Sequence, residues 1–432
     1  MRYLVDVKVG TLTEAQRLND ILMTEAPGVW AMLSALGKRA AFPRGIPFQS
    51  AEAKDVALNA TIGQVTDGRG LAMPLDVLSE QLPGVSPEET FLYLPVSGPV
   101  KLRKRWLERQ VRMAGGVGNC SLPIAVHGLT HGVSLAAAMF TDPDTTVLIP
   151  DLHWGNYRLI FGYQGCGSIE TYETFVDGVW DCEGLKRALD QVQGKVLVVL
   201  NFPNNPTGYM PTQDEAGRIV EILADYADPM CVLCDDAYQG FNYEKECVSR
   251  SLFWDLSDAL DRDRTVTIKV DGATKELLFF SSRIAFFTHN VRGEAEVAIE
   301  SKAKAIIRAT VGSVSGAASM MVERALASGR VESEVEQTMK EMRGRYEAVK
   351  ASLHLLPDEV TPLPFNSAFF AVFDLPDRLS AEELRQSLLT DDVGVVALAE
   401  PNMIRIAYCS LDAARIPALM ERISAHMRKL LA

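Results

Sequence analysis

The strongest constraint on the fold is a series of short apolar runs in the middle of the chain. They occur at 147–149, 196–200, 231–234 and 265–270, and helix-like segments separate them. Apolar strands that alternate with helices are typical of a parallel sheet that is buried on both faces. Such sheets bind ligands at the carboxyl ends of their strands. The sequence therefore predicts an α/β fold with its functional site at that end of the sheet.

After about residue 311 the pattern changes to a long polar helix, two apolar strands and a closing helix. This pattern is typical of a smaller α+β domain. The expected parts are an N-terminal helical segment that packs on the small domain (1–58), a large domain with a mostly parallel buried sheet (59–311) and a small C-terminal domain (312–432).

Composition excludes several classes of function. The net charge is −13, from 43 basic and 56 acidic residues, which does not suit nucleic acid or an anionic membrane surface. No apolar run approaches the ~20 residues that a membrane helix needs. The first residues, MRYLVDVKVG, lack the pattern of a secretory signal. We expect neither a nucleic-acid partner nor a membrane partner.

The cysteines point to a reducing compartment. There are seven, an odd number scattered along the chain, which favours free thiols and a cytoplasmic protein. Cys231 and Cys234 form a C-x-x-C, but residues three apart on a strand face opposite sides. No second pair follows at zinc spacing, so no metal site is expected.

Polar residues follow several of the apolar runs and form a chemically consistent set. The set comprises Asn205, Asp235, Tyr238, Lys275 and Arg283. A lysine amine can form a Schiff base with an aldehyde, and a carboxylate that faces a pyridine nitrogen keeps it protonated. An arginine can bind a phosphate and lower the pKa of a nearby lysine. The stretch 201–283 therefore suits a cofactor with a pyridine ring, a phenolic oxygen, an aldehyde and a phosphate.

Each of these residues also has an ordinary structural interpretation. Taken alone, Lys275 is a surface lysine, Asp235 a turn or helix cap, and Asn205 part of an Asn-Pro turn. The turn Thr130-His131-Gly132 opens a helix-like run after a strand, where backbone N–H groups bind phosphate well. His131 is either a phosphate ligand or a loop histidine.

Longer motifs carry a family resemblance. The main signatures are N-N-P-T-G (204–208), D-x-A-Y-Q-G-F (235–241) and K-(x)7-R (275–283). Further matches are N-A-T-I-G (59–63), Y-L-P-V-S-G (93–98), H-W-G-N-Y (153–157) and R-I-A-Y (405–408). In this order they resemble the fold-type I pyridoxal 5'-phosphate (PLP) enzymes of the aspartate aminotransferase superfamily, over residues 59–409.

The resemblance implies a role for each residue around the cofactor ring. Lys275 forms the internal aldimine with PLP, and Asp235 pairs with the pyridine nitrogen. Tyr238 and Asn205 bond to the phenolic oxygen, and Trp154 stacks on the ring. Lys275, Asp235 and Tyr238 are therefore the expected catalytic residues.

The resemblance also implies where phosphate and substrate bind. Arg283 and the 130–132 turn (Thr130, His131, Gly132) hold the phosphate, and Tyr93 reaches the phosphate of a neighbouring subunit. The active enzyme is therefore expected to be a homodimer with shared active sites. Arg405 binds the substrate α-carboxylate, with Gly63 and Asn205 nearby.

Three positions depart from the family pattern. Tyr157 stands where the family often has a histidine that supports the aspartate, and His131 stands where a small residue is usual. D-G-A-T precedes Lys275 in place of a serine-rich segment. Whether Thr274 or Ser281 supplies the missing hydroxyl to the phosphate stays open.

The substrate side chain is the least constrained feature. Arg308 lies where dicarboxylate-specific members carry a distal arginine from the partner subunit, but the next residues lack the family's S-N-P-P. It is equally a helix-end arginine near the dimer interface. The amino donor stays open between aspartate and aromatic or other neutral amino acids.

The predicted function is amino-group transfer between an L-amino acid and a 2-oxo acid, with 2-oxoglutarate as the expected acceptor. The alternatives are a β-lyase or decarboxylase on the same fold and, more remotely, a non-catalytic PLP-binding regulator. The resemblance also implies a cis peptide bond at Asn205–Pro206.

Overall fold

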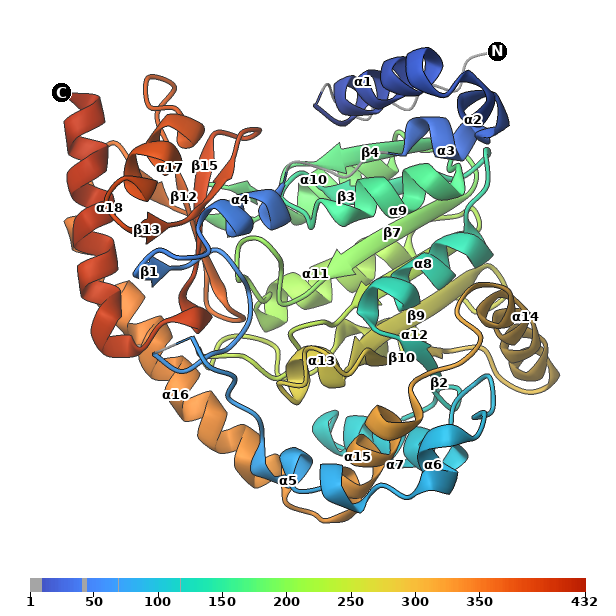
Figure 1. Ribbon diagram of the computed structural model, residues 1–432. Coiled ribbons are helices and arrows are strands. Elements are labelled where there is room, and N and C mark those ends of the chain that lie inside the picture. The colour runs from blue at the N-terminus through green and yellow to red at the C-terminus, as the bar shows by residue number, and fades with distance from the viewer. Residues whose placement is uncertain (1–9, 41–44, 69, 117) are drawn as a thin grey trace.

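The central element is a seven-stranded sheet with the strand order β2-β10-β9-β8-β7-β3-β4 (Figure 1). The computed structural model describes residues 10–40, 45–68, 70–116 and 118–432. The strands of this sheet are β2 (Ile124–His127), β3 (Thr146–Pro150), β4 (Ser168–Tyr172), β7 (Val196–Asn201), β8 (Met230–Asp235), β9 (Thr265–Gly272) and β10 (Ile284–His289). All neighbours are parallel except β10, which is antiparallel to β2 and β9. The mostly parallel sheet is confirmed.

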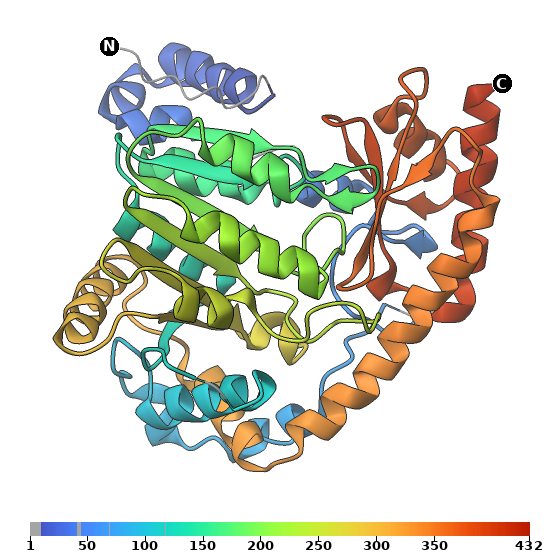
Figure 2. The same cartoon turned by 180° about the vertical axis from the view of Figure 1, so that it is seen from behind.

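Both faces of this sheet are buried. In β7, Leu197 belongs to one hydrophobic cluster and Val198 to another. Since successive side chains of a strand point to opposite faces, the two clusters are cores on the two sides of the sheet. Helix α8 (Leu129–Phe140) covers one face and α11 (Gln213–Ala224) covers the other (Figure 1, Figure 2).

The remaining elements of the large domain surround this sheet. Its other helices are α5 (Asp76–Ser79), α6 (Pro87–Phe91), α7 (Val100–Met113), α9 (Asn156–Gln164), α10 (Cys182–Leu189), α12 (Leu252–Ala259), α13 (Ala273–Glu276) and α14 (Glu294–Thr310). A short antiparallel pair is formed by β5 (Phe175–Val176) and β6 (Val179–Trp180). Helix α15 (Gly316–Ala327) packs against α7 and leads to the last part of the chain.

The C-terminal part is a four-stranded antiparallel sheet with its own helices. Its strand order is β11-β12-β15-β14. The strands are β11 (Thr361–Pro362), β12 (Phe370–Asp374), β14 (Val396–Leu398) and β15 (Met403–Ala407), and the helices are α16 (Val331–Ser352), α17 (Ala381–Leu389) and α18 (Ile416–Leu431). The short strand β1 (Leu58–Asn59) pairs with β13 (Val393–Gly394).

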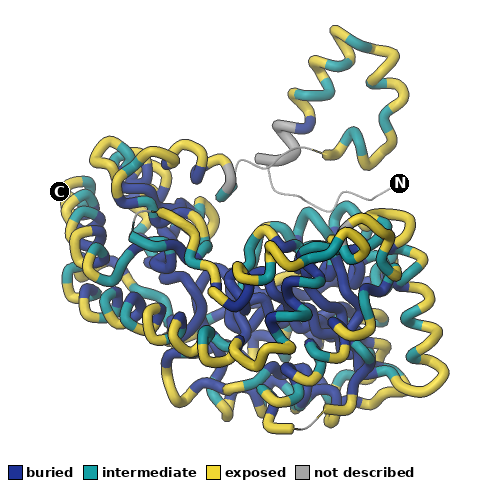
Figure 3. Tube along the Cα trace, turned by 60° about the horizontal axis from the view of Figure 1, so that its bottom comes forward, coloured by how far each residue is buried: buried dark blue, intermediate teal, exposed yellow. Residues whose placement is uncertain are grey.

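The N-terminal residues divide between two places. Helix α4 (Ile46–Glu52) packs on the small sheet, where Gln49 bonds both ways with the backbone of Ala397 (3.0 and 2.8 Å). The prediction placed residues 1–58 against the small domain as a whole. In the structure, helices α1 (Gly10–Glu25), α2 (Pro27–Met32) and α3 (Ala35–Arg39) project instead from the β4 side of the molecule (Figure 1, Figure 3).

The predicted cis bond at Asn205–Pro206 is wrong. Among the described residues, the cis bonds are Phe202–Pro203 and Glu400–Pro401. Asn204 closes the turn at this point, because its carbonyl accepts from the N–H of Gly208 (2.8 Å) and its side chain accepts from that of Thr207 (3.1 Å). The chain therefore reverses here without a cis bond before Pro206.

Within the described ranges, no helix is both long and apolar enough to cross a membrane. All seven cysteines are buried and free. Cys231 and Cys234 lie in the separate cores on the two sides of the sheet, as expected for residues three apart on a strand.

Candidate active site

Lys275 lies one turn beyond the end of β9, on the four-residue helix α13. A Cβ on Gly272, at the junction, would come within 2.8 Å of backbone and side-chain atoms of Ile284 and Ala285, so the chain turns here only with glycine. The Lys275 Nζ lies 5.2 Å from the centroid of the Tyr238 ring. Burial lowers the pKa of Lys275 to about 8; the charge of Asp235 opposes this shift and that of Arg283 adds to it.

Asp235 ends β8 and is almost completely buried. Its Oδ2 accepts a 2.5 Å hydrogen bond from the Tyr157 hydroxyl, while its Oδ1 has no hydrogen-bond partner in the described structure. Burial raises the pKa of Asp235, and the Tyr157 hydrogen bond and the Lys275 charge oppose that rise. A buried carboxylate oxygen without a donor is costly. The site therefore lacks one hydrogen-bond donor, which a protonated ring nitrogen would supply.

Tyr238 and Asn205 lie together beside this carboxylate. The Asn205 amide donates to the Tyr238 hydroxyl (3.3 Å), and Asn201 links the two strand ends by accepting from the Asn205 N–H and donating to the Asp235 carbonyl (both 2.8 Å). Burial raises the pKa of Tyr238, so its hydroxyl keeps its proton and can donate it in a hydrogen bond.

Arg405 brings a buried cation from the small domain to the same place. It is 2% exposed on β15 and donates to the Thr61 carbonyl (2.8 Å) and to the Asn205 side-chain oxygen (3.3 Å). Its Nε has no partner among the described residues, and burial lowers its pKa to about 10. A buried guanidinium bound only by neutral oxygens is suited to a carboxylate ligand.

Phe370 shapes the floor under this arginine. Its ring lies 4.5 Å from the Arg405 guanidinium carbon. A Cβ on Gly63 would come within 2.5 Å of the same ring, so residue 63 has to be glycine for the loop to approach. The structure thus brings Gly63 and Arg405 together, as the resemblance implied.

The N-terminus of α8 and Arg283 lie together and form a positively charged site. A Cβ on Gly128 would lie 2.3 Å from the Arg283 Nη2, so the guanidinium lies directly against the residue that precedes the helix. The His131 Nδ1 accepts from the backbone N–H of His127 (3.0 Å), and burial lowers the pKa of His131 to about 4. The ring is therefore neutral and carries its proton on Nε2, which makes Nε2 a donor. Thr130 and Gly132 lie in the same first turn of α8.

Thr274 is the better placed of the two candidate hydroxyls. Its Oγ1 is buried without a hydrogen-bond partner in the described structure, whereas Ser281 is exposed.

Trp154 packs edge to face on Tyr157, with 5.4 Å between ring centroids. Trp154 therefore lies next to the hydroxyl that binds Asp235.

Two predicted residues do not join this group. Tyr93 follows α6 and is 97% exposed, and Arg308 is exposed near the end of α14. A single chain therefore leaves these two side chains on its surface.

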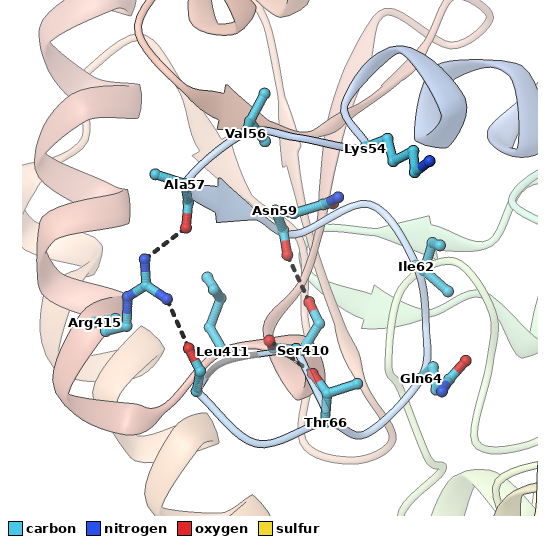
Figure 4. A pocket seen from close by; sticks show the side chains of 12 residues that line it. Lys54, Val56, Ala57, Asn59, Ile62, Gln64, Thr66, Ser410, Leu411 and Arg415 are labelled. Atoms are coloured by element: carbon cyan, nitrogen blue, oxygen red, sulfur yellow. Dashed lines mark hydrogen bonds between the residues drawn. The ribbon is translucent and has the colours of Figure 1, made fainter. Parts of the chain in front are cut away.

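A cavity of about 410 Å³ is lined by residues of the segment 54–68 and Gly70 on one side and by Ser410, Leu411 and Arg415 on the other (Figure 4). Several of its polar groups already bond to one another: Thr66 donates to the Ser410 carbonyl, Ser410 donates to the Asn59 carbonyl, and Arg415 donates to the carbonyls of Ala57 and Gly68. These bonds fix the backbone behind Gly63, and among the described residues that line the cavity none carries a buried side-chain donor or acceptor without a partner. The unpartnered Asp235 Oδ1 and Arg405 Nε mark the candidate site instead.

The chain matches the family model for aminotransferase class I and II over residues 57–423. It belongs to this family. Among curated proteins, the cytoplasmic aspartate aminotransferase of Caenorhabditis elegans is 23% identical over 322 residues, which cover 71% of the chain and 76% of that enzyme. The aspartate aminotransferase of Bacillus subtilis is 23% identical over 45% of the chain and 47% of that enzyme.

Solved aminotransferases share the fold. An aminotransferase from Anaerococcus prevotii superposes with a TM-score of 0.81 at 19% identity, over 92% of this chain and 99% of that one. The Thermus thermophilus aspartate aminotransferase with maleate gives 0.75 at 20% identity, over 91% and 99%. A Pyrococcus horikoshii kynurenine aminotransferase in complex with PMP gives 0.79 at 15% identity, over 94% and 98%. The expected fold-type I architecture and the transaminase family are therefore confirmed.

Sequence reasoning missed several residues that build this site. Asn201 is the polar last residue of an apolar strand, a signal that could have identified it. Phe370 and Thr61 carried no comparable signal, because each contacts Arg405 from a segment far away in the sequence.

Proposed function

We propose that this protein is a PLP-dependent aminotransferase that moves an amino group between an L-amino acid and a 2-oxo acid, with Lys275 as the lysine that attaches the cofactor. The unpartnered Asp235 Oδ1 carries the proposal. It lies in a buried site with a lysine of lowered pKa and a protonated phenol, which is the donor set that a phosphorylated pyridine aldehyde requires.

Bound PLP supplies an electron sink for the bond that breaks at the substrate Cα. Asp235, oriented by Tyr157, would keep the ring nitrogen protonated, and Tyr238 and Asn205 would hold the phenolic oxygen. Lys275 would accept and carry the proton that leaves the substrate Cα, a role that suits an amine with a pKa of about 8.

Further residues would bind the substrate and the cofactor. Arg405 takes the substrate α-carboxylate through its free Nε, and Trp154 covers the ring. Arg283 and the first turn of α8 would hold the phosphate, with Thr274 as a further donor. The expected acceptor is 2-oxoglutarate, and Arg308 is a candidate for a distal carboxylate of the donor.

We also propose a homodimer. Phe91, Leu92 and Tyr93 are consecutive and 83%, 66% and 97% exposed, which is unusual for large apolar side chains unless a partner covers them. In a dimer, Tyr93 would extend towards the partner's phosphate. Sedimentation or light scattering that shows a monomer at micromolar concentration would contradict this assembly.

The test of cofactor attachment compares Lys275, on α13, with Lys269, on the preceding strand β9. The purified protein should be yellow, and borohydride should fix the cofactor to the peptide that contains Lys275. Label on Lys269 would overturn the assignment. A panel of amino donors with 2-oxoglutarate then defines the reaction: a new amino acid supports transamination, whereas pyruvate with ammonia would support a β-lyase.

A further inference from the structure

A fully buried group of charges lies behind Lys275 and has no part in the chemistry described so far. The buried charge cluster consists of Arg109, Asp236, Lys269, Asp271 and Glu276, which are 3%, 2%, 2%, 1% and 1% exposed. Burying five charged groups costs desolvation free energy, which apolar side chains at the same positions would not cost. We therefore expect a role that requires the charges. Two of them are chain neighbours of the proposed catalytic residues Asp235 and Lys275.

Glu276 connects this cluster to α7. Its Oε2 accepts a 2.5 Å hydrogen bond from the Arg109 Nη1 and a 3.2 Å bond from the Gln110 Nε2. The Gln110 Oε1 in turn accepts from the Lys269 Nζ (3.0 Å), which also pairs with Asp271 and, at 3.5 Å, with Asp236. The cluster thus joins α7, β9, α13 and the residue after β8.

Helix α13 needs such an anchor. It has four residues and no side-chain cap at its N-terminus, so it has little stability of its own. Consecutive residues of a helix point about 100° apart. Lys275 therefore faces Tyr238 while Glu276 faces α7, and fixing one side chain fixes the direction of the other.

We propose that the Arg109–Glu276 pair is a positioning device, which holds α13 so that Lys275 faces Asp235 and Tyr238. The proposal rests on the function proposed for Lys275. Glu276 and Arg109 are positioning residues, since neither reaches the catalytic face. In the absence of the pair, the amine moves relative to the charges of Asp235 and Arg283.

This displacement has a readout that does not need turnover. The pKa of Lys275 depends on burial and on its distances to Asp235 and Arg283, so it reports the position of the amine. We would measure it in cofactor-free protein, from the pH dependence of Lys275 reductive methylation followed by mass spectrometry. In parallel, kcat and KM would be measured in the cofactor-loaded enzyme.

The variants are Glu276→Gln, Arg109→Gln and the double variant, with Arg109→Lys as the conservative replacement. Glu215→Gln is the matched control, because Glu215 is a buried, hydrogen-bonded glutamate that caps α11 away from the site. We expect each single variant to move the Lys275 pKa by about one unit and to lower kcat about ten-fold with little change in KM. The double variant should lower kcat no further than each single variant does, and Arg109→Lys should keep a higher kcat than Arg109→Gln.

The proposal is overturned if Glu276→Gln loses stability as Glu215→Gln does but leaves the Lys275 pKa and kcat unchanged. The pair would then be an ordinary stabilising contact. A wild-type protein that never binds PLP would refute the proposed function. The Lys275 pKa in the cofactor-free variants would still test the positioning role in that case.

Discussion

Lys269 and Lys275 lie six residues apart on one strand and the turn that follows it, yet their surroundings give them opposite properties. Lys269 faces Asp271 and Asp236, and these carboxylates raise its pKa against the effect of burial. Burial lowers the pKa of Lys275 to about 8, since only the charge of Asp235 opposes this shift and the cation Arg283 adds to it. The number of carboxylates that face a buried amine decides whether it is structural or reactive.

The largest expected effect separates the two lysines by activity. Lys275→Ala removes the proton carrier and the attachment point of the cofactor, so kcat should fall by about 10⁴-fold or more. Lys269→Met should keep measurable activity per folded molecule, because Lys269 does not reach the site. Steady-state kinetics on protein corrected for its folded fraction tests the comparison. Comparable losses in both variants would place Lys269 in the reaction.

The second effect separates them by stability. Lys269→Met leaves Asp271 and Asp236 buried without their cation, which costs about 3–5 kcal/mol of unfolding free energy. Urea denaturation at pH 7 measures the difference. The exposed pair Lys186–Asp190 is the control, since solvent screens this pair and Lys186→Met should leave the denaturation midpoint nearly unchanged. An unchanged denaturation midpoint for Lys269→Met would show that the cluster does not depend on its lysine.

These two lysines also show how far the sequence alone could be taken. Asp235 and Lys275 could be predicted because each follows an apolar strand, where the carboxyl ends of a parallel sheet place their side chains together. Their neighbours Asp236 and Glu276 could not be assigned a role. Their partner Arg109 lies 167 residues from Glu276 in the chain, and no local pattern announces that contact.

The departures from the family pattern gave a different result. The sequence raised the question whether Tyr157 could take the place of a histidine, and the structure shows its hydroxyl bound to Asp235. Local spacing could not decide this, because the bond depends on how α9 packs over the end of β8. The sequence therefore predicts residues whose place follows from the order of strands and turns, but not contacts that depend on how distant elements pack.

The third effect is a core substitution that is expected to raise the free energy of unfolding instead of lowering it. The folded protein lowers the pKa of Lys275 from 10.5 to about 8, so folding opposes its protonation. The associated stability is present above the unfolded pKa and is lost as the pH falls through about 8. In cofactor-free protein at pH 7, Lys275→Met should therefore be more stable than wild type, by about 1–3 kcal/mol. The gain should disappear near pH 10.5, and thermal unfolding at both pH values checks it; a loss at pH 7 would mean that Lys275 carries a stabilising charge.

The smallest effect concerns the charge balance of the cluster itself. With every group ionised, Asp236, Asp271 and Glu276 outnumber Lys269 and Arg109 by one charge. Burial raises the pKa of Asp236 to about 7, against the opposing effects of Lys269 and Ser251 and with reinforcement from Asp271 and Asp235. One retained proton on Asp236 would therefore make the cluster neutral.

For a carboxyl whose pKa is raised on folding, stability is full below the unfolded pKa and is lost as the pH rises through the folded value. Wild-type protein should thus lose stability between about pH 4 and pH 7 relative to Asp236→Asn, whose amide resembles the protonated acid. We expect the difference between the two proteins to change by at least about 1 kcal/mol between pH 5 and pH 8. Urea denaturation at each pH measures it, with exposed Asp258→Asn as the control. A difference independent of pH would mean that Asp236 stays ionised and that Lys269 is shared by two full charges, which would sharpen its contrast with Lys275 further.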